Sequence, residues 1–145
     1  MVLKEITLLS EEEYAKYKSI ISNAGWYWWL KTLDSHYDDG IRVVDDDGSL
    51  SFGNRDDCVG GVRPLCIFNL ESSNPMFWRK PKTLVGSKIK CGKFEWTVLN
   101  AEAGELYALC DEIIAKHRFD SKTNVWEDSE LKAWLESEGL SLITE

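Results

Sequence analysis

The 145-residue sequence lacks any apolar run long enough to cross a membrane, which takes about 20 consecutive apolar residues. Its first residues, MVLKEITLLSEEEY, place Lys4 and Glu5 ahead of the apolar residues and acidic residues directly after them. That order fits neither a signal peptide nor a transit peptide. We therefore expect a cytoplasmic protein without a membrane partner, and the length predicts a single domain over residues 1–145.

The sequence also lacks paired cysteines. Four cysteines stand singly, with no C-x-x-C pair: Cys58, Cys66, Cys91 and Cys110. Zinc sites need about four converging ligands, usually with one closely spaced pair, and the only histidines are His36 and His117. The pattern predicts reduced thiols that pack as small apolar groups, no metal site and no cofactor.

Catalytic motifs are missing as well. The sequence contains no G-x-S-x-G, no H-E-x-x-H and no phosphate-binding loop. Cys110 and His117 have the side chains of a nucleophile and a base, but ordinary packing explains the segment around each. We predict a non-enzymatic protein and keep a redox or metal enzyme at these two residues as a minor alternative.

Positive charge is scarce. The net charge is −8, and residues 34–57 carry eight aspartates against Arg42 and Arg55. Such a field repels phosphate backbones and attracts basic protein surfaces, so we predict no direct nucleic-acid binding and a basic protein partner. The residues expected to contact it are Asp38, Asp39, Asp45, Asp46, Asp47, Asp56 and Asp57. The alternative is that these aspartates only keep loops solvated.

Hydrophobic periodicity and turn residues predict an α+β fold with one small, twisted, mainly antiparallel sheet and two flanking helices. Strands are predicted near residues 5–9, 26–31, 41–45, 49–53, 60–70, 87–91, 93–100 and 105–110. DDDGS, at 45–49, begins like a calcium loop, but its glycine comes too early, so it predicts a hairpin turn. Pro64 weakens the start of the strand over 60–70. Residues 115–124 are expected to form a loop.

Two helices are predicted from capping signals. Ser10 and Glu13 form a capping box that begins a helix over residues 11–22, with Gly25 beyond its end. Asp128 is expected to cap a second helix that Gly139 ends. The segment ESSNPMFWRKPKTL holds two of the three prolines, and it predicts a connector between sub-blocks 1–70 and 84–145.

The aromatic run WYWW, residues 26–29, has two interpretations. In a strand, Trp26 and Trp28 point to one face while Tyr27 and Trp29 point to the other, so both faces are expected to be covered and the rings to fill the core. The alternative is a ligand pocket lined by Trp29 and Arg63, because indoles stack on sugars and guanidinium groups bind anions. Arg63 is otherwise expected to pair internally or to cap loop carbonyls.

Two blocks of the sequence resemble a known family. The first block resembles uncharacterised bacterial and phage domains marked by WWLRSPG and GVRPAL, and it consists of LLSEEEYAKY, WWLKT, the Asp-Gly hairpin and GGVRPL. The second block resembles that family's F-x-W-x-V-L and W-x-x-S-x-L-x-x-W-L block, and it consists of KCGKFEWTVLN and VWEDSELKAWLES. Lys31, Thr32 and Leu33 replace the family's Arg-Ser-Pro, and the blocks stand in permuted order. The resemblance implies a C-type-lectin-like fold, which serves sugar binding, protein binding and catalysis in different proteins.

Size, acidity and the resemblance to phage domains together predict a protein-binding factor of phage or mobile-element origin, working in the cytoplasm of a bacterial host. A target with a basic nucleic-acid channel, such as a defence nuclease of the CRISPR type, would complement the aspartates, and the factor would act as an anti-CRISPR inhibitor. The alternative function is a lectin-like module that binds a sugar or another small ligand.

Overall fold

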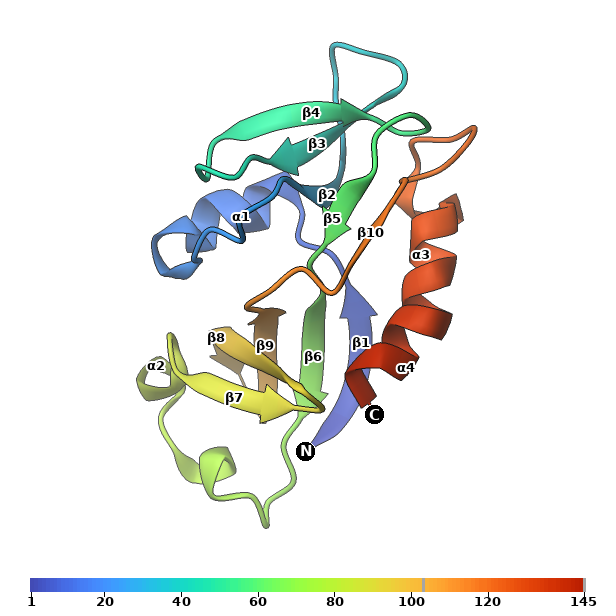
Figure 1. Ribbon diagram of the computed structural model, residues 1–145. Helices are drawn as coiled ribbons and strands as arrows, with labels where there is room; N and C mark the ends of the chain where they lie inside the picture. Colours follow the sequence, from blue (N-terminus) through green and yellow to red (C-terminus); the bar gives the residue numbers. More distant parts are fainter. Residues whose placement is uncertain (103, 145) are drawn as a thin grey trace.

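The computed structural model describes residues 1–102 and 104–144 and contains two five-stranded sheets, one above the other in Figure 1. The lower sheet has the order β1 (Val2–Thr7), β6 (Leu65–Asn69), β9 (Glu105–Cys110), β8 (Phe94–Glu102) and β7 (Lys88–Cys91). The upper sheet has the order β10 (Ala115–His117), β5 (Gly60–Val62), β2 (Trp28–Leu33), β3 (Gly40–Val44) and β4 (Leu50–Asn54). Neighbouring strands run antiparallel except β2 and β5, which pair in parallel at Trp28 and Gly61.

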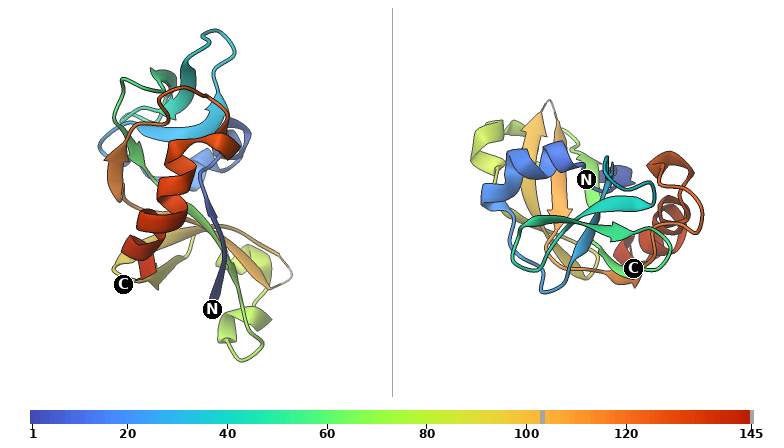
Figure 2. Two further views of the ribbon diagram at one scale, coloured as in Figure 1. Left: turned by 90° about the vertical axis from the view of Figure 1, so that its right-hand side faces the viewer. Right: turned by 90° about the horizontal axis from the view of Figure 1, so that it is seen from above.

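The helical elements are short. Those in the first two thirds of the chain are α1 (Glu11–Tyr17), the 3-10 turns η1 (Lys18–Ile20) and η2 (Pro75–Trp78), and α2 (Pro81–Leu84). Those near the C-terminus are η3 (Trp126–Asp128), α3 (Glu130–Trp134), the π-helical turn η4 (Leu135–Gly139) and α4 (Leu140–Thr144). In Figures 1 and 2, α1 lies beside the upper sheet, and the C-terminal helices run down one side past both sheets. The α+β prediction is confirmed.

The chain crosses from one sheet to the other at Arg63 and Pro64. The sequence predicts one strand over 60–70, whereas β5 belongs to the upper sheet and β6 to the lower one. Pro64 has no N–H to continue a ladder, so the strand breaks there and its two halves find different neighbours. This break is the reason that the structure has two sheets where the sequence predicts one.

The first helix begins as predicted and ends early. The Ser10 side chain accepts a hydrogen bond from the Glu13 N–H at 3.1 Å, and the Glu13 carboxylate accepts one from the Ser10 N–H at 2.8 Å, so the capping box is confirmed. The α-helix ends at Tyr17 and a 3-10 turn follows to Ile20, which falls short of the predicted end.

The second predicted helix differs at both ends. Ser129, and not Asp128, is the N-cap, because the Ser129 hydroxyl accepts the Lys132 N–H at 3.0 Å. Gly139 does not end the helical segment, which continues through α4 with Leu140 in right-handed helical geometry. Burial of Ile143 favours the additional turn over the glycine stop signal, since tertiary packing outweighs local propensity.

The strand β10, in the segment predicted as a loop, spans only Ala115–His117 and pairs with β5. Three residues are too few to show a periodicity, so the sequence carries no strand signal there.

The tryptophans of β2 fill both faces of the upper sheet, as predicted for a packed strand. Trp28 packs edge-on against Tyr14 of α1, with ring centroids 5.6 Å apart, while Trp29 packs edge-on against Phe119 on the other face at 5.8 Å. The Trp29 indole N–H donates to the His117 carbonyl at 2.8 Å. A Cβ at Gly60 would lie 2.6 Å from the Trp29 indole nitrogen, so the ring needs a glycine beneath it.

Trp26 departs from this pattern. It lies ahead of β2, is 42% exposed, and carries the Lys116 ammonium 4.0 Å from its ring centre. The prediction that all the rings of the aromatic run enter the core is therefore wrong for Trp26. The turn at Gly25, with φ of 80°, leads into the strand only after this residue.

Two matched substitutions test the packing. Trp29→Phe is expected to lower the free energy of unfolding by about 2–3 kcal/mol, because it leaves a cavity and an unpaired buried carbonyl. Trp78→Phe, at a side chain that is 74% exposed, is expected to change it by less than about 0.5 kcal/mol. Urea unfolding followed by circular dichroism measures both. Equal effects would contradict the assignment of Trp29 to the core.

Candidate functional site

The acidic segment folds into the β3–β4 hairpin, which forms the free end of the upper sheet (Figure 1). The strands pair from Gly40–Asn54 to Val44–Leu50, as the Asp-Gly turn predicts. The Asp45 N–H donates to the Ser49 carbonyl at 2.8 Å and the Gly48 N–H to the Asp45 carbonyl at 2.9 Å. Gly48 has φ of 90°, which a glycine adopts without strain.

One group of aspartates lies at this turn: Asp45, Asp46 and Asp47. The Asp47 carboxylate accepts the Ser49 hydroxyl at 2.6 Å and the Ser49 N–H at 2.9 Å. These hydrogen bonds favour the charged form and lower the pKa of Asp47, and Lys18 adds a smaller attraction. The Tyr14 hydroxyl donates to the Gly48 carbonyl at 2.6 Å and ties the turn to α1.

The second group lies at the opposite end of the hairpin: Asp38, Asp39, Asp56 and Asp57. Asn54 organises it, because its amide N–H donates to the Asp39 carboxylate at 2.6 Å. The Asn54 side-chain oxygen also accepts the backbone N–H groups of Asp56 and Asp57, at 3.0 and 3.2 Å. Asn54 therefore links the Asp39 carboxylate to the backbone of Asp56 and Asp57, and all four aspartates of this group are exposed.

Neither arginine of the segment neutralises these carboxylates. Arg42 pairs with Glu11 at 2.8 Å and with the buried Asp34 at 3.7 Å. Arg55 donates to the backbone carbonyl of Asp38 at 3.1 Å. Within residues 1–102 and 104–144, no lysine or arginine forms an ion pair with any of the seven predicted contact residues: Asp38, Asp39, Asp45, Asp46, Asp47, Asp56 and Asp57.

The structure thus divides the predicted acidic patch in two. A strand rises about 3.4 Å per residue, so the five residues of β4 separate the two aspartate groups by about 15 Å. Between them the hairpin exposes apolar side chains. Tyr37 and Phe52 stack with ring centroids 4.4 Å apart and are 52% and 45% exposed, and Leu50 is exposed beside them.

The residues of the alternative ligand pocket lie in the interior. Trp29 is fully buried and Arg63 is 1% exposed. Arg63 stacks over Trp28 at 5.0 Å, whereas Trp29 faces the other side of β2, so the structure does not bring Trp29 and Arg63 together.

Arg63 donates hydrogen bonds to backbone carbonyls inside the protein, as the sequence analysis predicts. Its Nε donates to the Cys110 carbonyl at 2.7 Å, and its terminal nitrogens donate to the carbonyls of Ser22 at 2.7 Å and Asp111 at 3.3 Å. Burial lowers the pKa of the Arg63 guanidinium, and Asp111 opposes that shift. The guanidinium is therefore engaged by the chain itself and not open to an anion.

Cys110 and His117 do not form a catalytic pair. Cys110 lies buried in β9 of the lower sheet, while His117 lies in β10 of the upper sheet. The His117 ring packs on Trp134 at 5.4 Å, and its Nδ1 donates to the Arg118 carbonyl at 2.6 Å. Burial raises the pKa of the Cys110 thiol to about 11, which leaves little thiolate at neutral pH. In the described part of the chain, no three His, Cys, Asp or Glu residues converge as metal ligands.

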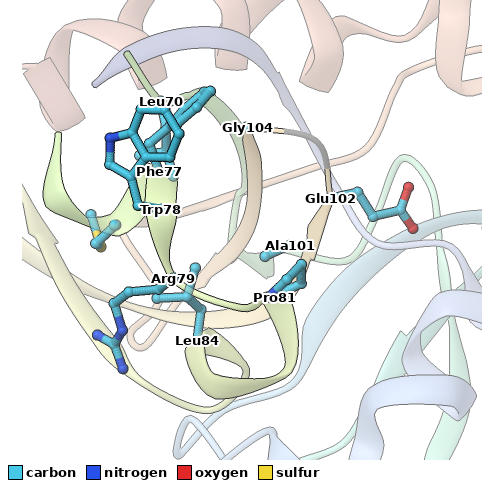
Figure 3. A pocket seen from close by; sticks show the side chains of 10 residues that line it. Leu70, Phe77, Trp78, Arg79, Pro81, Leu84, Ala101, Glu102 and Gly104 are labelled. Atoms are coloured by element: carbon cyan, nitrogen blue, oxygen red, sulfur yellow. The ribbon is translucent and has the colours of Figure 1, made fainter. Parts of the chain in front are cut away.

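A pocket of about 410 Å³ lies under the segment that the sequence predicts as a connector. In Figure 3 the rings of Phe77 and Trp78 lie beside Leu70, and Pro81 and Leu84 close the other side. Its edge carries two charged residues, Arg79 and Glu102. The sequence analysis did not predict this pocket. The adjacent aromatic residues Phe77 and Trp78 were a signal for it, because a short segment rich in turns cannot bury two neighbouring aromatic rings.

Comparison with known proteins adds no family or function: no family model, curated protein or solved structure matches the chain. Among the described residues, no helix is both long and apolar enough to cross a membrane.

The reactivity of the four thiols tests the prediction that Cys110 is a buried packing residue and not a catalytic nucleophile. We expect a thiol reagent at about pH 8–9 to modify native Cys58 and Cys91, which are partly exposed, and to leave Cys66 and Cys110 unmodified. Because the pKa of Cys110 is raised to about 11, increasing the pH within that range leaves it protonated. Mass spectrometry after timed labelling identifies the sites, with urea-unfolded protein as the control for full reactivity. Rapid modification of native Cys110 would contradict this assignment and favour a thiol enzyme.

Proposed function

We propose that this protein is a non-enzymatic, protein-binding factor that docks on a basic protein surface through the β3–β4 hairpin. The observation that carries the proposal is the exposed Tyr37–Phe52 stack lying between two groups of unpaired aspartates. Interfaces combine buried aromatic anchors with a charged rim in this way. The aspartates supply attraction and orientation, and the aromatic pair supplies apolar area.

The target class that fits best is a nuclease with a basic nucleic-acid channel. Carboxylates at the two ends of the hairpin mimic two stretches of phosphate charge, and their field increases the rate at which a cationic surface is met. A hairpin seated in such a channel would exclude the nucleic acid that the nuclease needs. The resemblance to phage-borne, C-type-lectin-like domains supports an inhibitor of a host defence nuclease of the CRISPR type.

The cellular setting follows from the same proposal. An inhibitor of a defence nuclease works in the cytoplasm of the bacterial host, where thiols stay reduced. The four cysteines are free, which suits that setting. The separation of Cys110 from His117 supports a binding role over catalysis.

Neutralising the turn tests the proposal. We expect Asp45→Asn, Asp46→Asn and Asp47→Asn together to abolish inhibition of DNA or RNA cleavage across a panel of purified CRISPR-type nucleases. Wild-type inhibition is expected to weaken steeply between about 50 and 300 mM salt, because exposed charges are screened.

The matched control changes the net charge by the same amount elsewhere, through Glu71→Gln, Glu95→Gln and Glu127→Gln, all at exposed positions. This control variant is expected to inhibit as the wild type does. If the two triple variants inhibited cleavage equally, the partner would bind away from the hairpin. If the wild-type protein inhibited no nuclease of the panel, the proposal of a nuclease target would be wrong.

A second function is favoured by the pocket in Figure 3. Trp78 presents a ring that is 74% exposed, and its indole N–H is held by the Ser72 carbonyl at 2.8 Å, so the ring offers a fixed face. Arg79 and Glu102 add polar partners at the edge of the pocket. An exposed indole with a few polar groups suits a sugar or another flat small ligand, which makes a lectin-like binding module the alternative.

A thermal-shift screen of sugars and nucleotides tests this alternative. A ligand at about 100 times its Kd stabilises the native state by about 2.7 kcal/mol and raises Tm measurably. We expect Trp78→Ala to remove the shift and Trp26→Ala, at an exposed tryptophan outside the pocket, to retain it. A shift that survives Trp78→Ala would place the ligand elsewhere, and a screen without any shift would count against the module.

A further inference from the structure

The four outer strands of the two sheets are protected to different degrees. β1 lies beside the C-terminal helices (Figure 1). A pocket is lined jointly by Leu3 to Ile6 of β1 and by Glu136 and Leu140 of the C-terminal segment. β7 carries Lys88 and Lys90, and lysine on an edge strand discourages pairing with other chains. β10 has three residues, and its His117 packs on Trp134 of α3. These three edges therefore carry common safeguards against strand addition.

β4 has none of these safeguards within the described residues. Its sequence, LSFGN, contains no charged residue and no proline. Leu50 and Phe52 expose apolar side chains, and β4 lies at the outer margin of the upper sheet in Figure 1. An uncharged, apolar edge strand is a template for a strand from another chain.

The alternation of hydrogen-bonded and non-bonded pairs in the hairpin places the unpaired backbone groups of β4 on its outer side. Asp45 bonds Ser49 and Asp39 bonds Arg55 across the hairpin, and bonded pairs alternate with non-bonded pairs in an antiparallel ladder. Leu50 and Phe52 therefore occupy non-bonded positions toward β3, and their N–H and C=O groups point to the open side. The residues with exposed apolar side chains are the ones whose backbone groups are free.

Charge argues against a second copy of the same chain as the occupant. If two β4 strands paired antiparallel about Phe52, the Asp45–Asp47 turn of each copy would meet Asp56 and Asp57 of the other. Parallel pairing would place each aspartate group beside its own equivalent. Both arrangements bring like charges together, which costs free energy, whereas a strand with cations at both ends would meet carboxylates at both ends.

We infer that β4 accepts an extended basic segment of the partner protein as a sixth strand of the upper sheet. The backbone of the segment bonds to Leu50 and Phe52, its apolar side chains pack on Tyr37 and Phe52, and lysines or arginines at its two ends reach the two aspartate groups. This inference rests on the proposed function for the basic character of the partner and adds the binding mode.

The test uses a synthetic peptide in which valine and threonine alternate between paired lysines at both ends. Phe52→Pro removes the outward N–H without breaking a bond to β3, and Phe52→Val removes the same ring but keeps the N–H. We expect the proline variant to bind the peptide about tenfold more weakly than the valine variant, as measured by fluorescence anisotropy. A peptide with glutamates in place of the lysines is expected not to bind.

Hydrogen exchange on the wild-type protein gives a readout that does not depend on how the variants fold. Saturation with the lysine peptide is expected to slow exchange of the Leu50 and Phe52 amides, while thermal unfolding verifies that both variants are folded. Equal affinity of the two variants, or unchanged exchange at these amides, would overturn strand addition. Sedimentation showing a wild-type dimer that Phe52→Pro dissociates would overturn the choice of occupant.

The two proposals fail in distinguishable ways. If strand addition is wrong but the hairpin binds basic surfaces, the two Phe52 variants bind the peptide with equal affinity, and neutralising Asp45, Asp46 and Asp47 still abolishes nuclease inhibition. If the proposed function is wrong, that triple variant inhibits as the control does, whatever the peptide shows.

Discussion

The buried guanidinium of Arg63 holds the two sheets in their relation to each other. It lies where the chain leaves β5 and enters β6, and it donates to the carbonyl of Ser22 and to the carbonyls of the adjacent residues Cys110 and Asp111, so it joins two distant segments to its own. A buried cation is costly unless its donors are satisfied, so the position is stable only when these segments converge. With Pro64 next to it, the chain must change sheets here, and the placement of the upper sheet follows.

α1 covers the upper sheet over Trp28 and reaches the hairpin through the Tyr14–Gly48 hydrogen bond and the Glu11–Arg42 ion pair, whereas the outer edge of β4 pairs with no other strand among the described residues. β2 uses both of its faces for packing, with Trp28 toward α1 and Trp29 toward Phe119. Phe52 of the outer strand β4 and Tyr37, which lies in the loop before β3, remain exposed. The tryptophan-rich run is thus mainly an interior feature, and the surface available to a partner lies two strands away from it.

Charge is distributed along the long axis of the molecule in Figure 1. The upper sheet ends in the aspartate groups of the hairpin, whereas residues 79–93, in and around α2 and β7 of the lower part, carry six lysines and arginines and no acid. Such a separation orients the molecule in the field of a charged partner, so that the hairpin approaches a basic surface first. The lysines on β7 have a second effect, since they protect this outer edge of the lower sheet against strand addition.

The sequence by itself determined the α+β class, the capping box at Ser10, the Asp-Gly hairpin, the meander of β7, β8 and β9, and the exposure of the aspartates. These features depend on residues close together in the chain, where caps, turns and periodicity act. Tertiary structure alone decided that residues 60–70 divide between two sheets, that β10 exists, and that Ile143 carries the last helix past Gly139. It also decided the site: the aspartates form two groups because β3 and β4 separate them, and Phe52 lies on an open edge because, among the residues that the structure describes, no later strand pairs with β4. Such long-range pairings depend on contacts between distant residues, which local patterns do not encode.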